Sequence, residues 1–230
     1  MRRRASTALS AAVLASLTIS GCAGSNARAG DSGSSPTAAV KPAPAARPAA
    51  PLTSAALAEH LLDETDLGQG YTRKPESSSS SRDGVTVIGC PALEHLGGDA
   101  AAGGSLDFAN SAKATFTYTR GTNSEVAEEL YSDTQAKLGL DTKTVFEAMT
   151  SCPLYQVVVS DTPIAVATQK LPAPAMGDEA WSHLLTFTAG GRDTVMKQTA
   201  VRAGSVLVVV SGSPALVDTH LNRAVDKARG

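Results

Sequence analysis

The spacing of apolar and polar residues divides the sequence into three parts. Residues 8–19 are mostly apolar, and residues 23–52 show no apolar period at all. Residues 53–230 instead carry repeated helical and strand patterns. This last part, about 178 residues long, is large enough for one domain with a buried core. We therefore expect a single domain at residues 53–230.

Helical spacing predicts five helices in the last part. They are expected at residues 53–62, 91–96, 122–139 and 141–152, and from residue 213 onward. In the third of these, Thr122-x-x-Glu125 matches a capping box and Gly139 is the expected end. Asp141 is expected to cap the fourth helix, which would turn Cys152 inward from its last turn.

Alternating apolar residues predict strands, most of them in the last third of the chain. They are expected at residues 71–74, 114–119, 157–159, 164–169, 181–188, 194–202 and 205–211, and residues 85–88 form a further short apolar segment. Residues 189–191 and 203–204 have the spacing of hairpin turns. The predicted fold class is α+β, an antiparallel sheet with helices packed on it.

The first 22 residues have the layout of a secretory signal. Three arginines precede the apolar run, and the small pair Ser20-Gly21 precedes Cys22. This order resembles the lipobox of bacterial lipoproteins, which implies cleavage after residue 21 and a lipid (acyl chains such as palmitate) on Cys22. The apolar run is shorter than the roughly 20 residues of a transmembrane helix. Cleavage without lipidation remains the other alternative.

Residues 22–52 are rich first in Gly and Ser and then in Ala and Pro, so we expect a disordered tether. Lipidation at Cys22 would then hold residues 53–230 at the outer face of the cytoplasmic membrane. Without residues 1–21 the chain has 17 basic and 22 acidic residues, a net charge of −5. Such a charge argues against nucleic-acid binding.

The two remaining cysteines, Cys90 and Cys152, form an even pair in an oxidising compartment, and we predict a disulfide between them. A metal site is the alternative, but no histidines stand near them at ligand spacing. No metal or cofactor is expected.

Motifs of known catalytic chemistry are missing from the sequence. Among the histidines, His183 stands out because strand alternation places it on one face with Trp181, where the two could line a cleft. A hydrogen-bonded core histidine is the alternative. Arg202 could hold an anionic ligand at a cleft rim, or simply flank a hairpin turn. The carboxylates of Asp178 and Glu179 are expected in a solvated turn.

Four short segments resemble actinobacterial lipoproteins grouped with the PknH-like extracellular sensor domain of receptor Ser/Thr kinases. They are Gly89-Cys90-Pro91-Ala92-Leu93, Thr150-Ser151-Cys152-Pro153, Gly177-Asp178-Glu179-Ala180 and Val201-Arg202-Ala203-Gly204-Ser205. The resemblance implies an antiparallel sheet with helices around a cleft, and a role in sensing or binding at the envelope. The kinase ectodomains have two disulfides, whereas this chain has cysteines for one and has no kinase domain.

The leading hypothesis is therefore a non-catalytic lipoprotein domain that binds a small molecule or an envelope protein. Trp181, His183 and Arg202 are its candidate ligand-binding residues. A carrier of an apolar lipid is the first alternative, and it predicts an enclosed apolar cavity. A hydrolase that pairs a serine with His183 is the second, and it predicts a serine hydroxyl within hydrogen-bonding distance of the ring.

Overall fold

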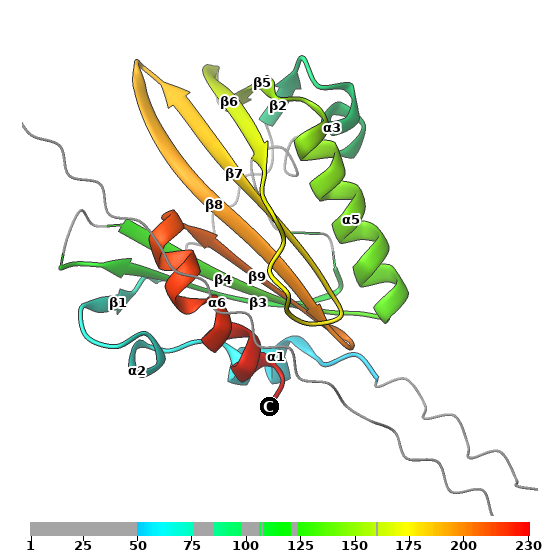
Figure 1. Cartoon of the computed structure of the whole chain (residues 1–230), viewed down its shortest axis with the longest axis vertical. Coiled ribbons are helices and arrows are strands. Elements are labelled where there is room, and N and C mark those ends of the chain that lie inside the picture. Colours follow the sequence, from blue (N-terminus) through cyan, green and yellow to red (C-terminus); the bar gives the residue numbers. More distant parts are fainter. Residues whose placement is uncertain (1–49, 76–84, 98–105, 107, 121–123, 160) are drawn as a thin grey trace, which may run out of the picture. The chain divides into compact units, whose positions relative to one another are not determined.

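In the part of the chain that the structure describes, nine antiparallel strands form one sheet, in the order β1-β3-β4-β9-β8-β7-β6-β5-β2 (Figure 1). This computed structural model describes residues 50–75, 85–97, 106, 108–120, 124–159 and 161–230. The strands are β1 (Tyr71–Arg73), β2 (Val85–Ile88), β3 (Asn110–Tyr118), β4 (Ser124–Ser132), β5 (Leu154–Val159), β6 (Thr162–Lys170), β7 (Glu179–Ala189), β8 (Arg192–Ala203) and β9 (Val206–Gly212). The helices are α1 (Ser54–His60), α2 (Glu64–Leu67), α3 (Pro91–Leu96), α5 (Gln135–Ser151) and α6 (Pro214–Ala228).

The predicted antiparallel sheet with packed helices is confirmed, in a mixed α+β fold in which strands predominate. Strands β5 to β9 follow one another as a meander of hairpins. At the β7–β8 turn, Gly190 and Gly191 have φ values of 56° and 75°, which glycine adopts without strain. The predicted signal peptide, Cys22, most of the tether and the serine-rich loop at residues 77–81 lie outside the described residues.

The helix predicted at residues 122–139 is wrong, because residues 124–132 form β4, which is paired with β3 on one side and β9 on the other. Val126 and Leu130 are four residues apart, a spacing that one helix face and one strand face share. Glu128 lies between them and points to the same side of the sheet. The pairing of two neighbouring strands overrides the local helix signal.

Helix α5 also corrects the prediction of a separate helix beginning at Asp141. It is one 17-residue helix capped by Thr134, and both Gly139 and Asp141 lie inside it. A Cβ atom on Gly139 would meet Glu179 Oε2 of β7 at 2.6 Å. The glycine therefore marks the place where α5 approaches the start of β7 closely, and it does not end a helix.

Helices cover the two faces of the sheet at different places. Leu57 of α1 and Val217 of α6 pack on Val208 and Val210, whereas Leu138 of α5 packs with the intervening Val209. Successive strand residues point to opposite faces, so α1 and α6 lie on one face and α5 on the other. The predicted inner stripe of α6 is buried, and its residues are Val217, Leu221, Ala224 and Ala228.

The predicted disulfide between Cys90 and Cys152 is confirmed, and the two Cα atoms are 5.7 Å apart. Cys90 is the N-cap of α3, and Cys152 is the C-cap of α5 just before Pro153. The bond therefore joins the start of one helix to the end of the other, over a core that includes Leu93 and Met149.

Candidate functional site

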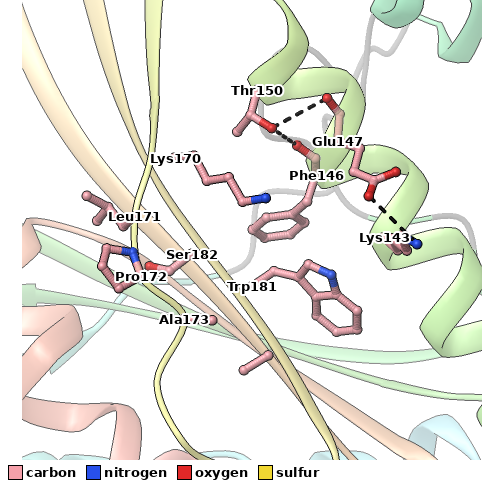
Figure 2. A pocket seen from close by; sticks show the side chains of 11 residues that line it. Lys143, Phe146, Glu147, Thr150, Lys170, Leu171, Pro172, Ala173, Trp181 and Ser182 are labelled. Carbon is pink, nitrogen blue, oxygen red and sulfur yellow. Dashed lines mark hydrogen bonds and ion pairs between the residues drawn. The ribbon is translucent and has the colours of Figure 1, made fainter.

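A pocket of about 380 Å³ opens between α5 and the start of β7, and we call it the α5 pocket. Figure 2 shows the side chains of α5 on one side and those of the β6–β7 connection and β7 on the other. Its lining residues are Lys143, Phe146, Glu147, Thr150, Lys170, Leu171, Pro172, Ala173, Ala180, Trp181 and Ser182. Two aromatic rings and two lysines therefore share one hollow, which is typical of a site for a small molecule.

The pocket follows from local sequence on both sides. On α5 the lining residues are three or four positions apart and so share one helix face. On the sheet side, β6 ends at Lys170, and Leu171 makes one more bond from its N–H to the Ser182 carbonyl at 2.9 Å. Pro172 and Pro174 have no N–H to continue the pairing. The chain therefore leaves the sheet here, and the gap beneath α5 stays open.

Trp181 and His183 lie on the same face of β7, under α5, where strand alternation placed them. Trp181 is half-buried and lines the α5 pocket. His183 is completely buried, and its ring contacts that of Phe146 in a tilted arrangement, with 4.5 Å between the ring centroids. Phe146 also faces Trp181 at 6.3 Å, so its ring stands between the pocket and His183.

Neither ring nitrogen of the buried His183 has a hydrogen-bond partner at normal geometry among the described residues, although the Gln198 side chain opposite it acts as a weak one. An unpaired buried polar group of this kind costs about 1–3 kcal/mol. Burial lowers the pKa of His183 to about 4, and contact with the Gln198 side chain acts in the opposite direction. The ring is therefore neutral at neutral pH. The serine–His183 pair that the hydrolase hypothesis requires is not formed within the described residues.

Arg202 lies in a neighbouring hollow, away from the α5 pocket. Its guanidinium pairs with Asp178 at 3.0 Å and with Glu179 at 2.8 Å, and Asp178 also accepts a hydrogen bond from the Gly204 N–H. The turn expected to be solvated is thus pinned to β8. An anionic ligand at Arg202 would have to displace two carboxylates. Lys143 lines both hollows and separates Arg202 from the Trp181 side.

The lipid-carrier alternative predicts an enclosed apolar cavity, and the α5 pocket differs from this in two respects. It is open to solvent on one side, and its lining includes charged side chains from Lys143, Glu147 and Lys170. Sequence reasoning found Trp181 but missed Phe146, Lys143 and Lys170. The first two lie on a helix that was predicted in two pieces, and the third lies at the end of a strand.

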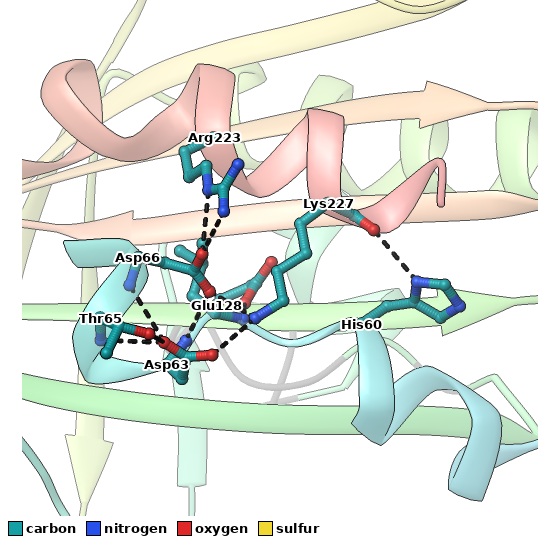
Figure 3. A network of polar contacts seen from close by, with 8 residues as sticks. His60, Asp63, Thr65, Asp66, Glu128, Arg223 and Lys227 are labelled. Carbon is teal, nitrogen blue, oxygen red and sulfur yellow. Dashed lines mark hydrogen bonds and ion pairs between the residues drawn. The ribbon is translucent and has the colours of Figure 1, made fainter.

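A second group of polar side chains, the Lys227 cluster, lies on the other face of the sheet (Figure 3). It consists of His60, Asp63, Asp66, Glu128, Arg223 and Lys227. Lys227 contacts both Asp63, at 2.9 Å, and Asp66. Arg223 Nε lies 2.9 Å from Asp66, and the Lys227 carbonyl is 3.0 Å from His60 Nδ1. The cluster thereby fastens the α1–α2 segment to α6.

Glu128 is the buried member of the Lys227 cluster. Its Oε2 accepts a hydrogen bond from the Leu62 N–H at 2.6 Å, while Oε1 has no partner among the described residues. Burial raises the pKa of Glu128 to about 7, despite the Leu62 bond and the nearby Lys227. For Asp66, burial would raise the pKa, but hydrogen bonds from Lys227 and Arg223 lower it on balance.

Among the described residues, no helix is long and apolar enough to cross a membrane. Within those same residues, no group of three or more His, Cys, Asp or Glu side chains is arranged to hold a metal ion.

Comparison with known proteins gives a likeness of fold. No known family profile matches the sequence, and no curated protein matches it. The extracellular domain of PknH from Mycobacterium tuberculosis is similar in structure, with a TM-score of 0.58 and 14% identity over 78% of this chain and 97% of that one. An uncharacterised Mycobacterium smegmatis protein, an Rv0999 ortholog, gives a TM-score of 0.40 at 10% identity, over 71% of this chain and 91% of that one. The chain therefore shares its fold with the PknH extracellular domain.

Proposed function

We propose that this protein is a non-catalytic, sensor-like binding domain, held at the outer face of the cytoplasmic membrane by a lipid on Cys22. The proposal depends chiefly on the α5 pocket, where a half-buried Trp181 and the lysine side chains line an open hollow. The fold shared with the extracellular domain of PknH supports an extracytoplasmic sensing role. The ligand occupies the α5 pocket and makes its largest apolar contact with Trp181.

Replacement of Trp181 tests the binding role. The full-length protein is incubated with a small-molecule extract of the cell envelope, and its thermal unfolding is followed. Extract should raise the Tm of the wild type but not that of Trp181→Ala. Leu154→Ala is the matched control, because Leu154 is 65% exposed on β5 and does not line the pocket. Equal Tm shifts for all three proteins would contradict binding at the pocket.

Replacement of Cys22 tests the anchor. Cys22→Ser removes the thiol that would receive the lipid, so the protein should no longer incorporate labelled palmitate and should leave the membrane fraction. Leu154→Ala is again the control, since Leu154 is exposed on the domain and its replacement should not affect acylation. Palmitate incorporation that survives in Cys22→Ser would refute the proposed anchor.

A further inference from the structure

Polar residues form a row across the face of the sheet that α5 covers. Lys170 of β6 pairs in register with His183 of β7, and His183 pairs with Gln198 of β8. Residues directly opposite each other on antiparallel strands point to the same side of the sheet. The row therefore runs inward from Lys170 at the α5 pocket to His183 and Gln198, both of which are buried.

The residues around this row are apolar, so its polar character is not needed for packing. On β7 the neighbours of His183 on the same face are Trp181 and Leu185, and on β8 those of Gln198 are Met196 and Ala200. Cores seldom retain a buried ring whose nitrogens have no partner. Phe146 connects His183 to the pocket, since its side chain lines the pocket and its ring contacts His183.

The charge of the pocket favours an anion. Lys143 has a partner in Glu147, with 3.8 Å between Nζ and Oε1. No ion pair involves Lys170 among the described residues, and its side chain extends from β6 toward Phe146 (Figure 2). Lys170 is thus the cation available to a ligand, and the rings of Trp181 and Phe146 are the surface available to an apolar group.

We propose that the α5 pocket binds a small carboxylate with an apolar body. The carboxylate pairs with Lys170, the apolar body packs against Trp181 and Phe146, and rotation of the Phe146 ring lets the ligand reach His183. This inference rests on the proposed function and specifies its ligand. The pocket volume of about 380 Å³ suits a molecule of this size.

Two matched pairs of probes test the charge requirement on the purified full-length protein. They are 4-phenylbutyrate with 4-phenylbutanol, and octanoate with octanol, measured by isothermal titration calorimetry. Each carboxylate should bind at least about tenfold more tightly than its alcohol. Lys170→Met should weaken carboxylate binding by about tenfold and leave the alcohols unchanged. Lys74→Met is the control, and it should change both by less than about twofold, because Lys74 pairs with Glu125 and does not line the pocket.

The role of His183 has its own readout. Saturation with 4-phenylbutyrate should move the ¹⁵N resonances of the His183 ring in the wild type, and Lys170→Met should need about tenfold more ligand for the same movement. His183→Phe should weaken binding by about threefold to tenfold without lowering the Tm of the free protein, because it removes an unpaired polar group. Unmoved ring resonances on saturation, or loss of Tm without loss of affinity, would overturn this part of the proposal.

The results test the carboxylate inference separately from the proposed function. Equal affinity for acids and alcohols, no binding of any probe, or no effect of Lys170→Met would overturn the carboxylate inference. If the envelope extract still raises the Tm of the wild type but not of Trp181→Ala, the proposed function survives that result. If the extract also fails to raise the Tm of the wild type, both the carboxylate inference and the proposed function are contradicted.

Discussion

The two faces of the sheet differ in how their buried polar groups, Glu128 and His183, are hydrogen-bonded. On the α6 side, a buried Glu128 receives the Leu62 N–H, and the acids around it pair with Arg223 and Lys227. On the α5 side, His183 has no hydrogen-bond partner among the described residues and lies behind an aromatic ring that borders an open pocket. The first arrangement holds two chain segments together and leaves one oxygen, Glu128 Oε1, without a partner among the described residues, whereas the second leaves both ring nitrogens of His183 unpaired beside a cavity. Under the proposed function, the α6 side serves stability and the α5 side serves binding.

The largest expected effect comes from the disulfide, which belongs to the α5 side alone. Cys90→Ser with Cys152→Ser opens a loop with a sequence separation of 62 residues. The free energy of unfolding should fall by about 4 kcal/mol, because the unfolded chain gains conformational freedom. Urea denaturation of the double variant measures the loss. Cys22→Ser is the control and should unfold like the wild type; a loss under about 1 kcal/mol in the double variant would show that packing alone holds α5 in place.

A second prediction compares how Glu128 on one face and His183 on the other make stability depend on pH. Folding raises the pKa of Glu128 from 4.5 to about 7. Between these pH values the folded protein therefore binds more protons than the unfolded chain, and its stability falls as pH rises. Folding lowers the pKa of His183 from 6.5 to about 4. Between these pH values the folded protein therefore binds fewer protons than the unfolded chain, and its stability falls as pH falls. Each effect is on the order of 3 kcal/mol over its full interval, and the two oppose each other where the intervals overlap.

Single variants separate these opposing slopes. Glu128→Gln should gain stability relative to the wild type as pH rises from 4.5 to 7, and His183→Phe should gain relative to the wild type as pH falls from 6.5 to 4. Urea denaturation at several pH values gives both curves. Parallel curves for a variant and the wild type would mean that the residue titrates normally in the folded protein.

The smallest effect concerns ion pairs. Lys227→Met leaves Asp66, which is 5% exposed, with only Arg223 and the Asp63 N–H as partners among the described residues, so the free energy of unfolding should fall by about 2 kcal/mol. Lys143→Met breaks a pair on α5 whose side chains are about 60% exposed and should cost under about 0.5 kcal/mol. Equal losses in the two variants would remove the proposed distinction between the faces.

Local sequence patterns were enough to predict most elements of the described chain. Alternation located β5 to β9, and Pro214 marked the start of α6. The failure at β4 has a specific cause, since Val126 and Leu130 fit both periods and only pairing with β3 and β9 decides between them. The face shared by Trp181 and His183 followed from alternation alone.

The polar contacts of both faces were beyond such reasoning, because they depend on register and on segments far apart in sequence. Nothing near Glu128 in the chain indicates that the Leu62 N–H will meet it, 66 residues away. The alignment of Lys170 with His183 appears only once β6 and β7 are paired. Phe146 falls within the helix predicted at residues 141–152, but its contact with His183 appears only once α5 is packed on the sheet.

The bond at Cys152 also limits how α5 can respond to a guest in the pocket. The helix is held at both ends, because Cys152 is joined to α3 and residues 133–134 connect the other end directly to β4. Leu138 near that end is completely buried. A guest would therefore displace side chains such as that of Phe146, while the helix as a whole keeps its place.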